Sequence, residues 1–337
     1  MGCCVVVGGT FGDEGKGKII SYIALRDNPS IAVRGGVGPN AGHTVVHKGR
    51  TIKLQMLPSA VVNEGTRLML GAGVLVDPQI LLKEIHDTDC QNRVFLDHNC
   101  AIIEAKHILK DNEGHLKEKI GTTGTGTGPA NADRVMRVCR IASQEPSIEE
   151  YVSDVMSAVN DSLDRKEFVV VEGTQGTLLS LYFGDYPYVT SKDVSASGIC
   201  SDVGIGPKRV DDVLAVFKAY LTRVGAGQLE GELEAEETFR RGWQEFGSVT
   251  GRMRRAAPFN FRLAKKSVRL NSASQVAITK LDTVWPETRG VREFEKLSPN
   301  SKDFILNVES ELGLPVVYIG TGPDAEDIID RRRRDNW

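Results

Sequence analysis

Residues 3–18 read CCVVVGGTFGDEGKGK. The apolar run from Cys3 to Val7 is continuous and rich in β-branched valine, and it stops at Gly8-Gly9, which is typical of a buried strand that enters a glycine loop. Strands that are buried on both faces belong to parallel sheets covered by helices. This stretch therefore predicts an α/β domain built on a parallel sheet.

The second half of this stretch, residues 12–18, fits the phosphate-loop pattern G-x-x-x-x-G-K directly after a strand. In such loops, backbone N–H groups surround phosphate oxygens at a helix N-terminus. A Ser or Thr that binds Mg²⁺ usually follows the lysine, but here Ile19 follows Lys18. A metal ion would need another oxygen ligand nearby, and Asp13 is the obvious candidate. A tight turn alone would also explain the glycines.

Further apolar runs predict strands at residues 168–171, 214–217, 275–279 and 316–319, each followed by a polar or glycine-bearing loop. Helix signals alternate with these strands. Asp77 precedes Pro78 as a helix cap, Ser147 and Glu150 form a capping box for a helix that continues to Val159, and Asn300 or Ser301 would cap a helix that ends at Gly313.

This alternation predicts a doubly wound, P-loop-NTPase-like α/β fold, with a mostly parallel central sheet and flanking helices. Ligands of such folds bind beyond the carboxyl ends of the strands, where the glycine clusters of this chain fall. No shift in composition marks a boundary, so we expect a single domain over residues 1–337, with loop and helical excursions near 85–140 and 228–265.

Composition excludes several classes of protein. The 337 residues carry a formal net charge of −3, which argues against a nucleic-acid-binding surface. No apolar stretch reaches the roughly 18 residues of a membrane span, and the N-terminus lacks the pattern of a signal peptide. The six cysteines have no paired C-x-x-C spacing and predict reduced, mostly buried thiols. We therefore expect a cytoplasmic protein that binds neither membranes nor nucleic acids.

A second glycine-rich segment, RGGVGPNAGHT at residues 34–44, ends in an imidazole. Glycine permits the backbone to approach a ligand closely. His43, with an ordinary pKa near 6.5, could serve as a general acid or as a hydrogen-bond donor to developing charge. A structural histidine is the alternative.

Three more segments carry polar chemistry. Residues 122–129 form a hydroxyl-rich loop that could bind a phosphate or a purine edge, or could be a polar turn without a ligand. The arginines of residues 249–255 could bind carboxylates or phosphates through two hydrogen bonds each, or could form a surface charge cluster. Thr279-Lys280-Leu281-Asp282 follows an apolar run and resembles the element of guanine-nucleotide-binding proteins whose carboxylate accepts the guanine N–H groups. Together with a phosphate loop, it favours GTP over ATP.

Taken in order over nearly the whole chain, these motifs resemble the adenylosuccinate synthetase family. The resemblance rests on residues 12–18, 40–44, 122–124, 172–173, 175–179, 186–190, 218–220, 222–225, 250–252 and 280–282. The chain is shorter than most of the family, between Arg140 and Phe168 and again between Asp282 and Val316, and it has Thr125 where an arginine is usual.

The resemblance implies a ligase that forms a C–N bond in purine nucleotide biosynthesis. GTP would phosphorylate O6 of IMP, and the amine of L-aspartate would then displace that phosphate, giving adenylosuccinate, GDP and phosphate. One Mg²⁺ ion would be bound by Asp13 and Gly42. By position, Asp13 is similar to the family's catalytic base and His43 to its catalytic acid.

The resemblance also assigns binding residues. IMP would contact Asp13, Glu14, Gly15, Lys16, Asn40, Ala41, Gly42, His43, Thr123, Gln175, Thr190 and Arg252, together with Arg137 from the neighbouring subunit of a homodimer. Aspartate would contact Val249, Thr250, Gly251, Arg252, Met253 and Arg254. GTP would contact Gly12, Asp13, Glu14, Gly15, Lys16, Gly17, Lys18, Gly42, His43, Thr44, Arg254, Lys280, Leu281, Asp282, Gly320, Thr321 and Gly322.

Two alternatives stay open at this point. One is a different phosphoryl-transferring ligase that uses the same phosphate loop with another acceptor, and residues 40–44 and 250–252 would discriminate it. The other is a GTP-binding switch without a metabolic substrate, against which stands Ile19 in place of a metal-binding hydroxyl.

Overall fold

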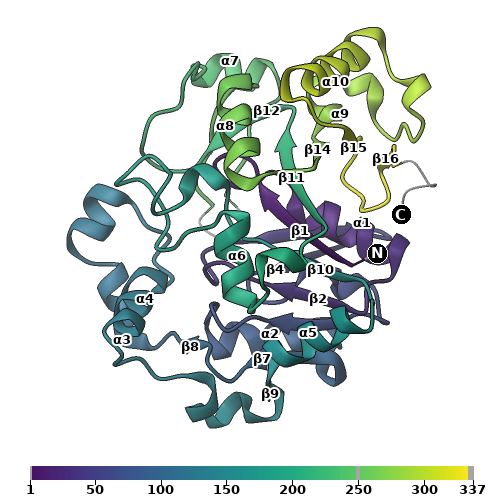
Figure 1. Ribbon diagram of the computed structural model, residues 1–337. Helices are drawn as coiled ribbons and strands as arrows, with labels where there is room; N and C mark the ends of the chain where they lie inside the picture. The colour runs from purple at the N-terminus through teal and green to yellow at the C-terminus, as the bar shows by residue number, and fades with distance from the viewer. Residues whose placement is uncertain (1, 248–250, 333–337) are drawn as a thin grey trace.

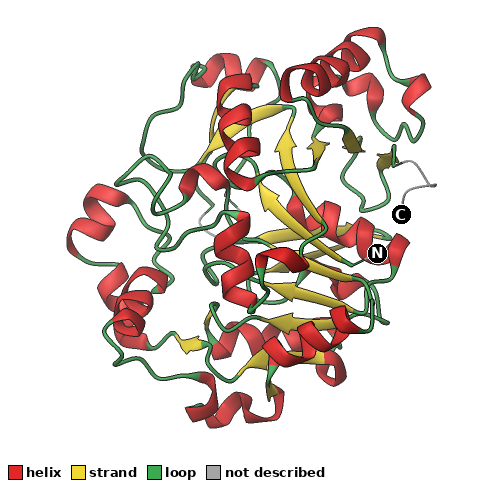
Figure 2. Ribbon diagram, viewed as in Figure 1, coloured by secondary structure: helices red, strands yellow, loops and turns green. Residues whose placement is uncertain are grey.

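The centre of the molecule is a ten-stranded sheet, shown by a computed structural model that describes residues 2–247 and 251–332. All neighbouring strands are parallel except the pair of β15 and β16 at one edge (Figures 1 and 2). In spatial order the strands are β16 (Ile328–Asp330), β15 (Val316–Gly320), β14 (Gln275–Thr279), β11 (Asp212–Lys218), β1 (Cys3–Gly8), β10 (Val169–Glu172), β2 (Ile31–Arg34), β5 (Arg67–Leu70), β7 (Val94–Asp97) and β9 (Val152–Ser153).

The five strands predicted from apolar runs are all present, as β1, β10, β11, β14 and β15. β1 lies in the middle of the sheet, where Val5 pairs with Val171 on one side and with Val213 on the other. Every residue of β1 is buried. The continuous apolar run thus predicted the strand correctly, because a central parallel strand has no face that meets water.

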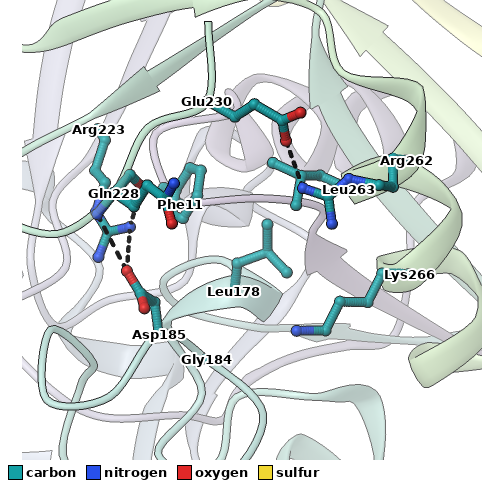
Figure 3. A pocket seen from close by; sticks show the side chains of 10 residues that line it. All are labelled: Phe11, Leu178, Gly184, Asp185, Arg223, Gln228, Glu230, Arg262, Leu263 and Lys266. Atoms are coloured by element: carbon teal, nitrogen blue, oxygen red, sulfur yellow. Dashed lines mark hydrogen bonds and ion pairs between the residues drawn. The ribbon is translucent and has the colours of Figure 1, made fainter. Parts of the chain in front are cut away.

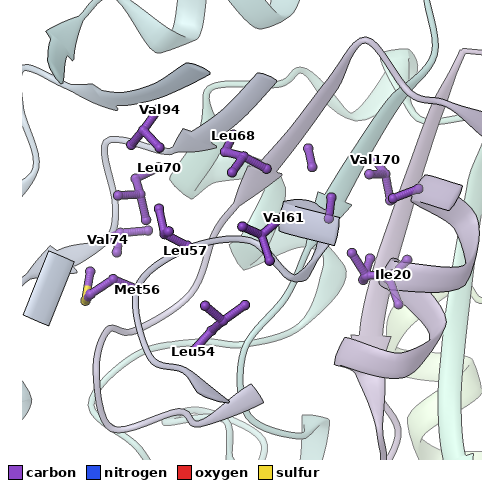
Figure 4. Close-up of a cluster of buried hydrophobic side chains, with 14 of the residues drawn as sticks. Ile20, Leu54, Met56, Leu57, Val61, Leu68, Leu70, Val74, Val94 and Val170 are labelled. Atoms are coloured by element: carbon purple, nitrogen blue, oxygen red, sulfur yellow. The ribbon is translucent and has the colours of Figure 1, made fainter. Parts of the chain in front are cut away.

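Helices cover both faces of the sheet. Alternate residues of β1 enter different cores: Val6 packs in the cluster that contains Ile20, and Val5 in the cluster that contains Ile199. Figure 4 shows the first of these clusters. Helices α1 (Lys16–Asp27) and α2 (Pro78–Thr88) cover the first face, and α5 (Val155–Asp164), α6 (Ala196–Val203), α8 (Phe261–Asn271) and α10 (Pro299–Leu312) cover the second. The predicted doubly wound fold is confirmed.

Helix caps were predicted less well than strands. Asp77 caps α2 as expected, and its carboxylate accepts hydrogen bonds from the backbone N–H groups of Gln79 and Ile80. The single helix predicted from Ser147 to Val159 is wrong. A 3₁₀ turn (Pro146–Tyr151) is followed by edge strand β9, and α5 begins only after its own cap, Asp154.

The predicted cap of α10 is also misplaced. The helix starts at Pro299, with Ser298 at the cap position, because proline is favoured at the first helical position, where its missing N–H is not needed. Its end at Gly313, which has a left-handed φ of 66°, agrees with the prediction.

Two stretches leave the sheet. Residues 98–140 contain α3 (Ala105–Asp111) and α4 (Thr127–Val135), and a small core formed by Val37, Leu75, Ile103 and Ala130 joins them to the body. Residues 220–258 contain β12 (Tyr220–Arg223), α7 (Ala235–Arg240) and β13 (Arg255–Pro258). The remaining elements are β3 (His43–His47), β4 (Arg50–Leu54), β6 (Leu75–Val76), β8 (Ala101–Ile102) and α9 (Leu281–Val284).

The structure bears on the expectations about the cysteines and about membrane spans. All six cysteines are free and five are buried, and burial raises the pKa of the Cys100 thiol to about 12, so this thiol is unreactive near neutral pH. Among the described residues, no helix has both the length and the apolar character needed to cross a membrane.

Candidate active site

The glycine loop joins the carboxyl end of β1 to α1, and it is held from inside by Glu14. The Glu14 carboxylate is fully buried and accepts hydrogen bonds from the backbone N–H groups of Thr10 at 2.9 Å and Gly12 at 2.8 Å. The Glu14 side chain, predicted to contact IMP and GTP, therefore points into the loop and fixes its shape. Gly15, with φ of 83°, caps α1 in a left-handed conformation that glycine adopts without strain.

Lys16 joins this loop to the turn after β10. Its ammonium group is buried, forms an ion pair with Glu14 at 3.3 Å and donates to the backbone oxygen of Gln175 at 2.5 Å. The two loops are in such close contact that a Cβ on Gly176 would lie 2.3 Å from the backbone nitrogen of Gly12. The predicted IMP residue Gln175 is thus held beside the phosphate loop.

Asp13 has a left-handed backbone with φ of 63°, and 26% of its side chain is exposed. Its carboxylate forms an ion pair with Arg254, with 3.0 Å between Oδ2 and Nε. This contact is electrostatic, because the buried Nε of Arg254 makes no hydrogen bond within the described part of the chain. The structure thus brings the predicted base together with a predicted aspartate- and GTP-binding arginine.

His43 begins β3 and lies against the start of α1, where a Cβ on Gly17 would be 3.3 Å from the Cβ of His43. Its Nδ1 contacts the carboxylate of Glu172, the last residue of β10. A carboxylate only accepts, so Nδ1 donates and Nε2 is the ring nitrogen left for a ligand. Glu172 also accepts from the backbone N–H and the hydroxyl of Ser59, both at 2.6 Å.

Burial acts on both members of this pair, but it decides the direction of the pKa shift only for His43. It lowers the pKa of His43 below its ordinary value, against the opposing attraction of Glu172. Burial alone would raise the pKa of Glu172, but the attraction of His43, of Arg34 and of the Ser59 hydroxyl outweighs it, and the pKa lies below its usual value. Glu172 is therefore an anion that orients the imidazole.

The predicted IMP residues Asn40 and Thr190 also meet. The Asn40 amide nitrogen lies 3.3 Å from the Thr190 hydroxyl, and the Asn40 amide oxygen is buried without a hydrogen-bond partner among the described residues. A buried acceptor without a partner is costly, so this oxygen suits a ligand donor. The neighbouring Ala41 oxygen accepts from the buried Arg34 guanidinium at 3.2 Å.

Arg252 connects the arginine loop to the hydroxyl-rich loop. Its guanidinium donates to the backbone oxygens of Gly121 at 2.9 Å and Thr122 at 2.8 Å, next to Thr123. Gly251 has a left-handed φ of 64° and Met253 is half exposed. The predicted aspartate residues Val249 and Thr250 lie outside the described residues.

Three of the five segments predicted to bind GTP, residues 12–18, 280–282 and 320–322, lie at the carboxyl ends of β1, β14 and β15. Lys18 donates to the backbone oxygen of Asp324, and a Cβ on Gly320 would lie 3.1 Å from its Cε. Burial lowers the pKa of Lys18 to about 8, although the carboxylates of Asp327, Asp324 and Asp282 oppose the shift. Lys18 is thus surrounded by elements that the sequence assigns to the nucleotide.

The guanine element follows β14. Lys280 has a left-handed φ of 59° and a half-exposed side chain, and Leu281 is buried at the start of α9. The Asp282 carboxylate is buried and lies 3.3 Å from Arg289. Thr321 is buried, and its hydroxyl donates to the backbone oxygen of Val291 at 2.7 Å. Gly322 is closely packed, because a Cβ at this position would lie 2.4 Å from the Asp327 carboxylate. Thr44, in contrast, is exposed on β3.

Arg137 is the predicted residue that stands apart. It follows the end of α4, with a left-handed φ of 64° and an exposed side chain. Exposed apolar side chains flank it at Val135, Met136 and Val138.

A cavity of about 210 Å³ is lined in part by Phe11, which belongs to the glycine loop (Figure 3). Ion pairs join Arg223 to Asp185 and Arg262 to Glu230 across its wall. None of the predicted binding residues lines this cavity.

A group of potential metal ligands lies elsewhere, at His47, Asp324 and Glu326. Glu326 is exposed, and exposed carboxylates often gather without an ion, so we assign no metal to it. The predicted pair is Asp13 and Gly42, a partly buried carboxylate and a backbone carbonyl, and these hard oxygen donors suit Mg²⁺.

Sequence reasoning missed several residues that organise the site. Glu172 is part of a motif that carries the family resemblance, but it was given no role, although its position at the end of a predicted strand, where site residues of such folds gather, indicates one. Ser59 and Glu245 lie in stretches without periodicity, so nothing in the sequence indicated them. Ser59 contacts Glu172, which is 113 residues away along the chain, and Glu245 contacts Lys218, which is 27 residues away.

The chain is similar in sequence to a known family of enzymes. The sequence model of the adenylosuccinate synthetase family matches residues 5–145 and 138–285. The chain belongs to the adenylosuccinate synthetase family. The adenylosuccinate synthetase of Methanocaldococcus jannaschii is 52% identical over 334 residues, covering 98% of this chain and 97% of that relative. The enzyme of Archaeoglobus fulgidus is 51% identical and covers 99% of both chains.

The similarity extends to a solved three-dimensional structure. The fully ligated adenylosuccinate synthetase of Plasmodium falciparum superposes with a TM-score of 0.90 at 25% identity, covering 98% of this chain and 99% of that chain. Family membership decides against both alternatives, the ligase with another acceptor and the GTP-binding switch. Since the archaeal relatives are covered almost completely, they share the short form of the chain.

Proposed function

We propose that this protein is a cytoplasmic enzyme that ligates L-aspartate to IMP at the expense of GTP. The observation that carries the proposal is the convergence of Asp13, His43 and Arg254 around the glycine loop: Asp13 forms an ion pair with Arg254, and His43 packs on Gly17. A base, an imidazole and a guanidinium around one phosphate loop are what phosphoryl transfer to a purine oxygen needs.

In the first step, Asp13 takes the N1 proton of IMP while O6 attacks the γ-phosphorus of GTP. A carboxylate is a weak base for this proton, so proton removal and capture of the oxygen by phosphorus must be concerted. His43, oriented by Glu172, presents Nε2 to the transferring group. A bound polyphosphate would oppose the effect of burial on the His43 pKa, because nearby negative charge favours the imidazolium.

Mg²⁺ would be held by the Asp13 carboxylate and the Gly42 carbonyl. The partly buried carboxylate of Asp13 already pairs with a cation, Arg254, so its position suits the binding of positive charge. When bound, the ion neutralises charge on the phosphates. With the ion bound, Asp13 would hold Arg254 less strongly, and the guanidinium would be able to reach the substrates.

In the second step, the aspartate amine displaces the phosphate from C6. Guanidinium groups grip carboxylates bidentately, which suits the loop 249–254 to the two carboxylates of aspartate. Arg252 ties this loop to the backbone beside Thr123, on the proposed IMP side. The buried carboxylate of Asp282 would accept the N–H groups of guanine, a pattern that adenine lacks.

The direct test is an assay of the purified protein with IMP, GTP, aspartate and Mg²⁺. We expect adenylosuccinate, GDP and phosphate in equal amounts, measured by chromatography, and no product when GTP is replaced by ATP or when Mg²⁺ is chelated. Absence of adenylosuccinate under the complete conditions would refute the proposed function.

We also propose a homodimer in which Arg137 reaches the IMP phosphate of the neighbouring subunit. The exposed Val135, Met136 and Val138 beside Arg137 support this, because a patch of large apolar side chains on the surface marks an interaction site.

Hybrid dimers test the shared site. Arg137→Leu and Asp13→Asn variants are each expected to be nearly inactive, but a mixture that has exchanged subunits should recover activity. In a two-fold dimer, half of the random pairs are hybrids and each hybrid has one intact site, so equal amounts should give about a quarter of wild-type activity. No recovery, with subunit exchange verified by mass spectrometry, would contradict the shared site.

A further inference from the structure

Residues 245–247 pair with residues 252–254 as the two arms of a hairpin, and the second arm belongs to the proposed aspartate loop. The backbone oxygen of Glu245 accepts from the N–H of Arg254 at 2.9 Å, and the next residues inward, Phe246 and Met253, form an antiparallel bridge. Gly247 in turn donates to the oxygen of Arg252 at 2.8 Å. Glu245 and Arg254 are therefore paired across the point where this hairpin leaves the body of the protein.

The Glu245 carboxylate gathers cations from several elements. It lies 3.1 Å from the ammonium of Lys218, at the end of β11, and 3.8 Å from that of Lys280, after β14. It also binds Arg254 Nη1 and accepts from the Tyr220 hydroxyl. Its side chain is only 11% exposed. Burial alone would raise the pKa of Glu245, but Lys218, Lys280 and Arg254 lower it to about 2, so the carboxylate is charged at neutral pH.

The surroundings fix the position of this anion. Lys218 is buried beneath it, and the Tyr220 ring is stacked on Trp243 with 4.6 Å between centroids. Arg254, in contrast, reaches from Glu245 to Asp13, so one guanidinium spans two carboxylates. Lys218 and Tyr220 hold Glu245 on the sheet side, and Glu245 holds Arg254.

We propose that Glu245 is a positioning residue that fixes Arg254, and with it the base of the 245–254 hairpin, in the orientation that binds the carboxylates of aspartate. This inference rests on the proposed function of the 249–254 loop. Glu245 touches no substrate itself. It keeps Arg254 in the site when Asp13 holds the guanidinium less strongly, because a buried anion remains as its second partner.

The test compares Glu245→Gln with a matched control, Glu232→Gln. Glu232 forms an ion pair with the next arginine, Arg255, at 2.7 Å, but both side chains are partly exposed. Glu245→Gln should raise the KM for aspartate about 10-fold or more, change kcat and the KM for IMP less than about 3-fold, and Glu245→Asp should recover part of the loss. Glu232→Gln should behave as wild type.

Two further measurements separate positioning from a general structural role. The double variant Glu245→Gln with Arg254→Gln should bind aspartate no worse than Arg254→Gln alone, because the effect of Glu245 passes through Arg254. Hydrogen exchange of peptides covering residues 245–254, which needs no turnover, should be faster in Glu245→Gln than in wild type. Additive losses in the double variant, an equal rise in every KM or unchanged exchange would each overturn the proposal.

The proposed function and this inference fail in different ways. A wild-type protein that makes no adenylosuccinate would count against the function, and the exchange measurement would still decide whether Glu245 fixes the hairpin. An active wild type whose KM for aspartate is unchanged in Glu245→Gln would overturn the inference alone.

Discussion

Replacing Asp13 with asparagine is expected to lower kcat about 10³-fold or more while nucleotide binding stays within a few-fold of wild type. The amide cannot take the N1 proton and is a weaker ligand for Mg²⁺, and loss of acid–base help alone typically costs about 10²- to 10⁴-fold. The phosphate loop itself should persist, because Glu14 and not Asp13 holds its backbone. Steady-state kinetics and calorimetric titration with GDP measure both quantities.

Asparagine is the appropriate replacement because Asp13 has a left-handed backbone, which Asn tolerates and alanine does not. Asp89→Asn is a matched control, since Asp89 is also left-handed, with φ of 51°, at the exposed end of α2. It should retain full activity. Wild-type turnover in Asp13→Asn would contradict the assignment of Asp13 as the base.

Replacing Glu172 with glutamine should lower kcat on the order of 10²-fold and also reduce thermal stability. The neutral amide no longer stabilises positive charge on His43, so the imidazole loses both its orientation and its readiness to carry a proton. Stability falls because the buried Arg34 guanidinium loses the nearby negative charge of Glu172 that compensates it. Kinetics and thermal denaturation give the two readings.

Glu84→Gln separates these two effects. Glu84 is also a buried carboxylate, but it accepts from the backbone N–H groups of Gln55, Met56 and Leu57 and does not contact the imidazole. This variant should lose stability while kcat at a permissive temperature stays near wild type. Equal losses of kcat in both variants would show that Glu172 acts only through folding.

Much of the fold could be predicted because the central strands are buried on both faces and appear as unbroken apolar runs, as in β1 and β14. The region around Ser147 could not, since its apolar residues have helical spacing but Val152 pairs with Leu96 at the sheet edge and Asp154 starts the helix anew. Local patterns compete there with a tertiary pairing that the sequence does not reveal.

The same limit applies to the site. Motifs placed the glycine loop, His43 and the Lys280-Leu281-Asp282 element, because each requires particular residue types at fixed spacing. They did not indicate that the Glu14 side chain points into the loop, or that Arg254 bridges Asp13 and Glu245. These contacts depend on how distant segments approach one another.

The tight packing of glycines around the phosphate loop has a consequence for attempts to change specificity. A Cβ on Gly8 would lie 2.4 Å from the Gln175 oxygen, one on Gly9 would lie 2.1 Å from the Phe217 ring, and one on Gly176 would collide with Gly12. Libraries that vary these positions would mostly yield chains that do not fold. Directed evolution toward another nucleotide should instead diversify Lys280 and the neighbours of Asp282, where side chains can change without disturbing the backbone on which catalysis depends.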